Sequence, residues 1–199
     1  MLGCLAGYAV ERVTDPVRLD VALHVAGSMS RGSAVSAAAG DMVTTECLRL
    51  VDGELVSGGE TQQFDFGDGR GPLASFPVAL PDLITIWRST GVRNIGTFVN
   101  VSGDAFPTGD LDDLPEGPAP EEREASPYHA AVTVTAADGS VSRAVLHTVN
   151  GYTFTPIAAV EAAKRVLAGE VRPGFHTPAG LFGSGFVETV AGSQLRVLQ

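Results

Sequence analysis

The sequence predicts an α+β fold, in which helices pack on one face of a mixed and mostly antiparallel sheet. Segments with the two-residue period of a β-strand outnumber the segments that have helical spacing. Two pairs of these strand segments meet at Asp-Gly dipeptides, which are typical of tight antiparallel hairpins. The regular βαβ repeats of a parallel sheet are missing from the sequence. We therefore predict no complete Rossmann domain.

The first half of the chain is predicted to contain helices and strands in an irregular order. Residues 2–13 place apolar side chains on one side of a helix, which Asp15-Pro16 ends because proline cannot continue it. Residues 17–25 alternate apolar and more polar side chains, as in a strand with one buried face. Further on we expect a helix at 33–45, a hairpin at 47–56 that turns at Asp52-Gly53, strands at 61–66 and 73–78, and a helix at 82–89 that Asp82 caps and Gly91 ends.

The second half is predicted to add antiparallel strands and one long helix. A strand is expected at 95–101, and a second hairpin extends from 128 to 149 with its turn at Asp138-Gly139. Thr155-Pro156 is predicted to open the long helix, because threonine caps helices and proline suits the first helical position. Gly169 ends this helix. Two short apolar runs in the tail, at 186–190 and 195–198, are expected to be strands.

An acidic, proline-rich loop at 103–127 interrupts this pattern. Between Ser102 and Pro127 there are eight acidic residues and one arginine, which together give −7 of the net charge of −10. Such a composition is typical of an exposed and poorly ordered segment. We predict a single domain over residues 1–199 with this loop as a surface excursion. A linker between two small lobes is the alternative, because loops of this length are uncommon in a compact domain.

The overall composition excludes several classes of partner. A net charge of −10 repels phosphate backbones, so neither nucleic acid nor an anionic membrane surface is an expected partner. The chain has no run of about 18 apolar residues that a membrane-spanning helix needs. Cys4 and Cys47 are too few for a disulfide framework or a four-thiolate zinc site. We therefore expect a cytoplasmic protein with free thiols.

Sequence motifs identify no cofactor, metal or catalytic residue in this chain. The densest glycine cluster, at 67–71, does not have the GxGxxG spacing of a dinucleotide site, and a Walker A motif is missing. The histidines at 24, 129, 147 and 176 are not at metal-ligand spacing, and no GxSxG motif of a serine hydrolase is present. We predict no cofactor and no metal for this chain alone, and the catalytic residues stay unidentified.

Ser30, Arg31 and Tyr152 are the predicted substrate-binding residues. Ser30 and Arg31 stand between a predicted strand and a predicted helix, where backbone N–H groups and a cation point toward one anion or carboxylate. The alternative interpretation is a serine that caps the helix beside a solvated arginine, which is the commoner use of serine. Tyr152 precedes the long helix in the same way. Packing of this ring and capping by Thr155 would also explain its position.

Several stretches of the sequence together resemble the C-terminal, non-Rossmann part of saccharopine-dehydrogenase-like proteins, a family that includes the trans-acting enoyl reductases. The best match begins at Asn150-Gly151-Tyr152-Thr153, runs through Gly169 and continues at 173–178. The other stretches that carry the resemblance are 17–45, 64–69, 89–95 and 117–123, and the order along the chain is kept. The short acidic loop departs from the family, whose members often have a longer, more basic or apolar stretch there.

The resemblance implies one half of a two-part oxidoreductase. In that family an N-terminal Rossmann domain binds NAD(P), and the following domain covers the nicotinamide and shapes the substrate pocket. The chain is then expected to supply the small-molecule substrate side of an NAD(P)-dependent enzyme, to lack the nucleotide-binding half and to be inactive alone. Met1 would be an internal methionine or the start of a truncated product.

A second class of function stays open. The alternative is a non-catalytic dimerisation or interaction module derived from the same family. Such a module would pair with a copy of itself or with a separate nucleotide-binding domain, because apolar strands without their expected neighbour leave an exposed apolar face.

Overall fold

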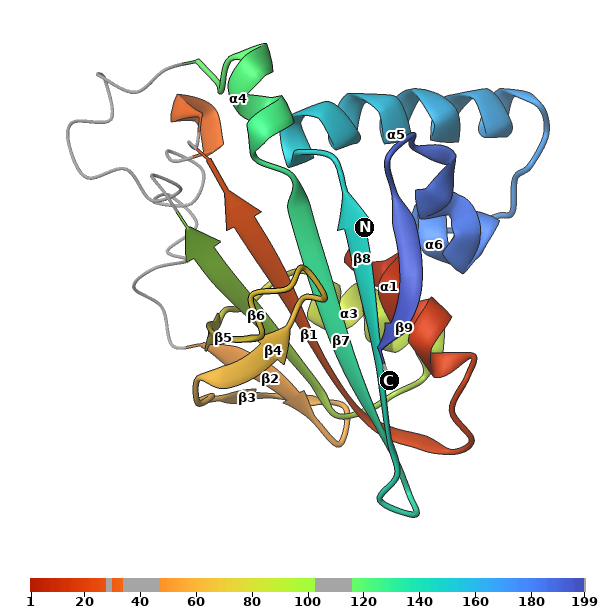
Figure 1. Cartoon of the computed structure of the whole chain (residues 1–199). Helices are drawn as coiled ribbons and strands as arrows, with labels where there is room; N and C mark the ends of the chain where they lie inside the picture. The colour runs from red at the N-terminus through yellow and green to blue at the C-terminus, as the bar shows by residue number, and fades with distance from the viewer. Residues whose placement is uncertain (28–29, 34–46, 103–115, 199) are drawn as a thin grey trace.

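The computed structural model describes residues 1–27, 30–33, 47–102 and 116–198 and confirms the predicted α+β class (Figure 1). Its first half contains α1 (Leu2–Val10), β1 (Pro16–Ala26), β2 (Leu48–Val51), β3 (Glu54–Ser57), β4 (Gln62–Asp65), β5 (Pro72–Pro77), α3 (Asp82–Thr90) and β6 (Ile95–Ser102). Its second half contains α4 (Pro120–Ala125), β7 (Tyr128–Ala136), β8 (Val141–Thr148), α5 (Gly151–Leu167), α6 (Pro178–Phe182), the 3₁₀ helix η2 (Ser184–Thr189) and β9 (Gln194–Leu198).

The strands form one mixed sheet in the order β3-β2-β6-β1-β7-β8-β9, with β5 attached to β6 and β4 paired to β5. Within the described residues β1 and β6 are the one parallel pair, and the other pairings are antiparallel. Both parallel strands point toward the end of the sheet along which α5 lies (Figure 1). A single parallel pair is too little for a complete Rossmann domain, as predicted.

The main core lies between one face of the sheet and the helices. Alternate residues of β1, β6, β7 and β8 face this core, because side chains of a strand point to opposite faces in turn. The apolar helix α1 lies buried against these strands and contacts α3 and η2. A smaller cluster on the other face joins Phe64 and Phe66 to Ala22, Phe98 and Val145. The hairpin β4–β5 thus covers part of the face that the helices leave open (Figure 1).

The predicted start of the long helix was wrong. Helix α5 begins at Gly151 and not at Thr155-Pro156, so that Pro156 lies inside the helix. Asn150 caps α5, since its Oδ1 accepts from the Tyr152 N–H at 3.0 Å. Thr155 instead donates its hydroxyl to the Gly151 carbonyl at 2.8 Å.

Other local predictions were also corrected. Asp82 lies in the first turn of α3 and makes no side-chain cap. The run at 186–190 forms most of η2 and is not a strand, because its apolar side chains pack on α1. Residues 120–125 of the acidic loop form the helix α4. The helix predicted at 33–45 and residues 103–115 of the loop lie outside the described residues, except for a helical turn at 31–33.

Candidate functional site

The candidate site is the junction between the end of β1 and the beginning of α5. The Ser30 backbone N–H donates to the Tyr152 hydroxyl at 2.7 Å, although 122 positions separate the two residues. The Tyr152 hydroxyl donates in turn to Ser33 Oγ at 3.0 Å. Ser30 is buried, with 6% of its surface exposed. The structure therefore brings two of the three predicted substrate-binding residues into direct contact.

Ser30 also caps the helical turn at 31–33. Its Oγ accepts from the Ser33 backbone N–H at 3.1 Å, which is the usual N-cap contact. Arg31 follows in the same turn and is exposed. The capping interpretation of Ser30 is thus present in the structure, together with the contact to Tyr152 that sequence alone did not suggest.

A second tyrosine completes the junction. The buried ring of Tyr128, the first residue of β7, lies so close to Gly151 that a Cβ there would come within 2.6 Å of it. Burial, together with the nearby Tyr152, raises the pKa of Tyr128 to about 12. This phenol therefore stays neutral at physiological pH. Asn150 holds the junction together, because its Nδ2 donates to the Ser126 carbonyl at 2.8 Å.

The junction offers neutral hydrogen-bonding groups at the carboxyl ends of two parallel strands. The phenols of Tyr128 and Tyr152 and the hydroxyls of Ser30 and Ser33 supply donors and acceptors without a formal charge. In open sheets, ligands bind in the crevice outside the carboxyl ends of parallel strands. The position and the chemistry of the junction suit a polar, uncharged group of a small molecule.

A row of three histidines crosses the other, open face of the sheet. His24 on β1 pairs in register with His129 on β7, which pairs in turn with His147 on β8. The rings of His24 and His129 stack with centroids 6.1 Å apart, and those of His129 and His147 are 4.6 Å apart. Asn100 and Gln194 extend the same row onto β6 and β9.

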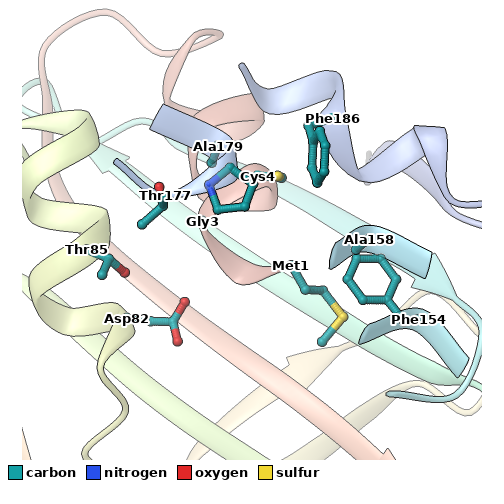
Figure 2. Close-up of a pocket in the computed structure, with 11 residues that line it drawn as sticks. Met1, Gly3, Cys4, Asp82, Thr85, Phe154, Ala158, Thr177, Ala179 and Phe186 are labelled. Carbon is teal, nitrogen blue, oxygen red and sulfur yellow. The ribbon is translucent and has the colours of Figure 1, made fainter. Parts of the chain in front are cut away.

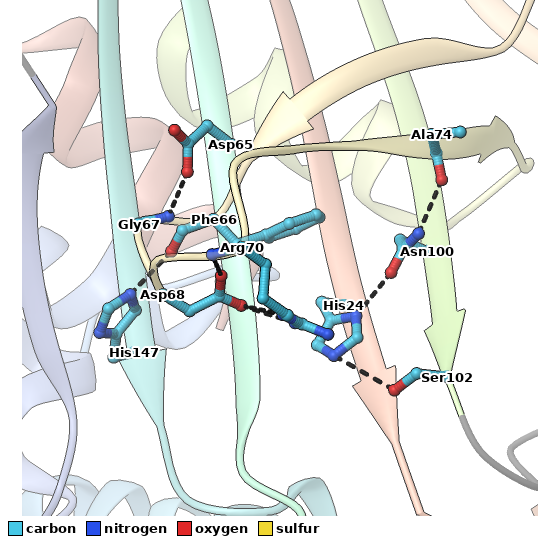
Figure 3. A network of polar contacts seen from close by, with 10 residues as sticks. All are labelled: His24, Asp65, Phe66, Gly67, Asp68, Arg70, Ala74, Asn100, Ser102 and His147. Carbon is cyan, nitrogen blue, oxygen red and sulfur yellow. Dashed lines mark hydrogen bonds and ion pairs between the residues drawn. The ribbon is translucent and has the colours of Figure 1, made fainter.

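The histidine row is defined as His24, His129 and His147. Two of its members, His24 and His147, take part in hydrogen bonds that tie the β4–β5 hairpin to the sheet (Figure 3). His147 Nε2 donates to the Phe66 carbonyl at 2.7 Å. Asn100 donates through Nδ2 to the Ala74 carbonyl at 2.7 Å, which leaves its Oδ1 to accept from His24 Nδ1 at 2.7 Å. These bonds hold the hairpin at Phe66, where its loop begins, and at Ala74 within β5.

Two rings of the histidine row, those of His24 and His129, favour the neutral form at pH 7. Burial, together with the neighbouring His147, lowers the pKa of His129 to about 4. Burial also lowers the pKa of His24. The ion pair between Asp68 and Arg70, with an N···O distance of 2.6 Å, lies in the loop above the row (Figure 3). Nδ1 of His129 is buried and has no hydrogen-bond partner among the described residues.

The sequence patterns do not reveal the histidine row, because no local pattern places the three histidines side by side. The three residues lie 105 and 18 positions apart along the chain, and only the strand register aligns them. A weak signal existed, because each histidine belongs to the more polar of the two alternating sets of residues in its strand and lies close to a strand end. Within the described part of the chain, no group of three or more His, Cys, Asp or Glu residues is placed to hold a metal ion.

A small pocket of about 200 Å³ lies within the helical layer (Figure 2). Met1, Cys4, Asp82 and Phe154 are among its lining residues, which come from α1, α3 and α5 and the region of α6. Burial raises the pKa of the Cys4 thiol, so the reactive thiolate is disfavoured there. Burial likewise raises the pKa of Asp82. The pocket thus has no activated nucleophile among its lining residues.

Fold and site together define an α+β domain with a neutral polar junction at the carboxyl ends of β1 and β6. Comparison with known proteins adds no relative: no model of a protein family matches the chain, and no curated protein matches it. None of the helices in the described ranges has both the length and the apolar character that a membrane span requires.

Proposed function

We propose that the chain is the substrate-side domain of an NAD(P)-dependent, saccharopine-dehydrogenase-like oxidoreductase whose nucleotide-binding half is not part of these 199 residues. The observation that carries this proposal is the contact between Ser30 and Tyr152 at the end of β1. Both residues come from stretches on which the family resemblance rests. Their convergence supports a common role in holding a small-molecule substrate, in a protein that works in the cytoplasm.

The division of labour follows from the chain's own residues. The sequence contains no GxGxxG or Walker A motif, so NAD(P) is assigned to the missing half. Hydride transfer is the chemistry that the cofactor supplies, and the protein's task is to orient the substrate and exclude water. Ser30 and Tyr152 would orient a polar group of the substrate by hydrogen bonds, and Arg31 would attract a carboxylate to the exposed side of the same turn. No general acid or base is assigned.

Calorimetric titration of the purified chain with NADPH tests the assignment of the cofactor. We expect no binding up to about 1 mM NADPH, a concentration that corresponds to a binding free energy of only about −4.1 kcal/mol. Micromolar binding would contradict the proposal, because the chain would then hold the nucleotide without a partner domain.

A panel of small carbonyl and enoyl compounds, followed by amide NMR, tests the substrate side. Ligands of the junction should shift the amide signals of Ser30, Ser33 and Tyr152 in the wild type and much less in Tyr152→Phe. The variant should also lose about 1–2 kcal/mol of stability, since the buried Ser30 N–H loses its acceptor. Tyr8→Phe is the matched control, because no hydrogen bond joins the Tyr8 hydroxyl to the described residues. A panel that leaves all three amides unshifted contradicts a substrate role for the junction.

One observation favours the second candidate function, a non-catalytic interaction module. The outer side of α5 exposes Ile157, Val160 and Leu167, the last with 87% of its surface accessible. Apolar side chains that gather on one exposed side of a helix can mark a protein–protein interface. Sedimentation velocity over a range of concentrations separates the two functions. The interaction module would be favoured by two results together: the chain dimerises and Leu167→Lys abolishes the dimer, and no compound of the panel binds at the junction.

A further inference from the structure

A larger pocket lies on the helical side of the molecule, away from the junction at β1 and α5. It has a volume of about 660 Å³ and lies between α3 and the segment at 172–180. Ile84, Thr85, Arg88 and Ser89 contribute from α3, and residues from Arg172 to Gly180 form the opposite wall. Pockets of about 300–1,000 Å³ are typical of small-molecule sites.

The charge of this pocket is opposite to that of the chain. The sequence has 23 acidic and 13 basic residues. Among the described residues, however, the pocket lining contains two arginines, Arg88 and Arg172, and neither aspartate nor glutamate. An acid-free concavity with two guanidinium groups attracts anions and repels cations, whatever the net charge of the surrounding surface.

The wall at 172–180 is held in place by its own hydrogen bonds. Arg172 donates one N–H to the Gly180 carbonyl, which leaves four of its five donors for a ligand. His176 Nε2 donates to the Pro173 carbonyl at 3.0 Å, and Thr177 Oγ1 accepts from the Gly180 N–H at 3.1 Å. The arginine on this wall is therefore preorganised, which lowers the entropy that binding costs.

The side chain of Arg88 completes the cationic pair from the last turn of α3. It is exposed, and no ion pair or hydrogen bond joins it to another described residue. Arginine binds carboxylates and phosphates through two parallel N–H···O bonds, so both guanidinium groups suit the same classes of anion. The hydroxyls of Thr85 and Thr177 offer further donors along the lining, whereas the Ser89 hydroxyl donates to the Ile86 carbonyl at 3.1 Å.

Apolar groups line the rest of the pocket. Ile84 lies on the α3 side, and the ring of Phe175 is 81% exposed on the opposite wall. A ligand that covers this ring would gain hydrophobic free energy in addition to the charge-assisted bonds. The space, the charge and the apolar walls together select an organic molecule over a bare inorganic ion.

We propose that the pocket between α3 and residues 172–180 binds a small organic anion, with a carboxylate or phosphate held by Arg88 and Arg172 and an apolar body against Phe175. This site goes beyond the proposed function. It belongs to a different part of the fold from Ser30 and Tyr152, and it requires no nucleotide-binding half.

NMR titration of the whole chain with phenyl phosphate and benzoate tests the site. Both compounds should shift the amide signals of Ser89, Thr177 and Gly180 saturably, with dissociation constants at or below about 1 mM. Inorganic phosphate should bind more weakly, and benzyl alcohol, which has the ring without the charge, should bind least. No saturable shift up to about 10 mM would overturn the proposal. Equal binding of inorganic phosphate would overturn the assignment to an organic anion.

Charge-matched variants separate this site from general attraction of anions. Arg88→Gln should weaken phenyl phosphate binding about tenfold or more, the loss that goes with one charge-assisted hydrogen bond. Arg143→Gln removes the same charge from an exposed position on β8 and should leave the affinity unchanged. Equal weakening by both variants would overturn the proposal. Because Arg88 has no described partner to lose, the folded structure of its variant should be unaffected, which the remaining amide spectrum checks directly.

Discussion

At the scale of single residues, Gly96 leaves room for the ion pair between Arg18 and Asp20 on the neighbouring strand, because glycine has no side chain. Asp20 is 7% exposed on β1 and receives two hydrogen bonds from the Arg18 guanidinium, at 2.7 and 3.0 Å. Gly96 lies opposite Asp20 on β6. A Cβ at this glycine would come within 2.5 Å of Asp20 Oδ1 and 2.8 Å of the Phe98 ring. Neither neighbour is free to move, because the first is ion-paired and the second is buried.

Gly96→Ala is therefore expected to destabilise the protein by about 2 kcal/mol, through overpacking and a disturbed Arg18–Asp20 pair. Urea unfolding measures the change. Gly185→Ala is the control, because its Cβ would meet no atom within 4 Å and its backbone is not in the left-handed region. Equal stability of the two variants would show that β1 and β6 are not packed as closely as described.

At the scale of secondary-structure elements, the histidine row on β1, β7 and β8 makes the stability of the protein depend on pH. In the folded protein the pKa of His129 is about 4, compared with an ordinary value of 6.5. Between these values the unfolded chain takes up a proton that the folded protein does not bind. The stability that the neutral His129 contributes is therefore fully present above about pH 6.5 and is lost as the pH falls toward 4. His147, His24 and Arg70 disfavour the charged ring, and Asp68 opposes them.

Replacing His129 with leucine should remove much of this acid sensitivity. We expect the loss of stability between pH 7.5 and pH 5 to shrink by about 1 kcal/mol, after allowance for solvent screening at a partly buried site. Urea unfolding at both pH values gives this difference. Thr133→Leu, on the same strand and face, controls for the added apolar side chain. Because burial also lowers the pKa of His24, part of the slope should persist. An unchanged slope in His129→Leu would show that this imidazole does not cause it.

At the scale of the whole molecule, the sheet connects segments from the beginning to the end of the chain. β1 starts at residue 16, β9 ends at residue 198, and both belong to the same sheet. The main core contains residues of α1, α3, η2 and the central strands together. We therefore predict one cooperative unfolding transition for the single predicted domain.

Two probes at different places check this cooperativity. Trp87, the one tryptophan of the sequence, lies on α3 against the main core, so its fluorescence reports the helical layer. Far-ultraviolet circular dichroism reports the backbone as a whole. The two denaturation curves should have the same midpoint in urea. Separate midpoints would instead favour the alternative of two small lobes joined by the acidic loop.

The sequence by itself determined the elements that depend on neighbouring residues. Alternation predicted β1, Asp52-Gly53 predicted the β2–β3 turn, where both residues have positive φ, and Gly91 predicted the end of α3. Local patterns are reliable here because short-range steric and hydrogen-bonding preferences decide these features.

Only the tertiary structure decided how these elements meet. It paired β1 with β6 in parallel, aligned the histidine row, began α5 at Gly151 beside Tyr128, and joined Ser30 to Tyr152 across 122 positions. Each of these features depends on strand register and on packing between distant segments. A one-residue shift in register would turn His24 into the helical core, while leaving every local pattern unchanged.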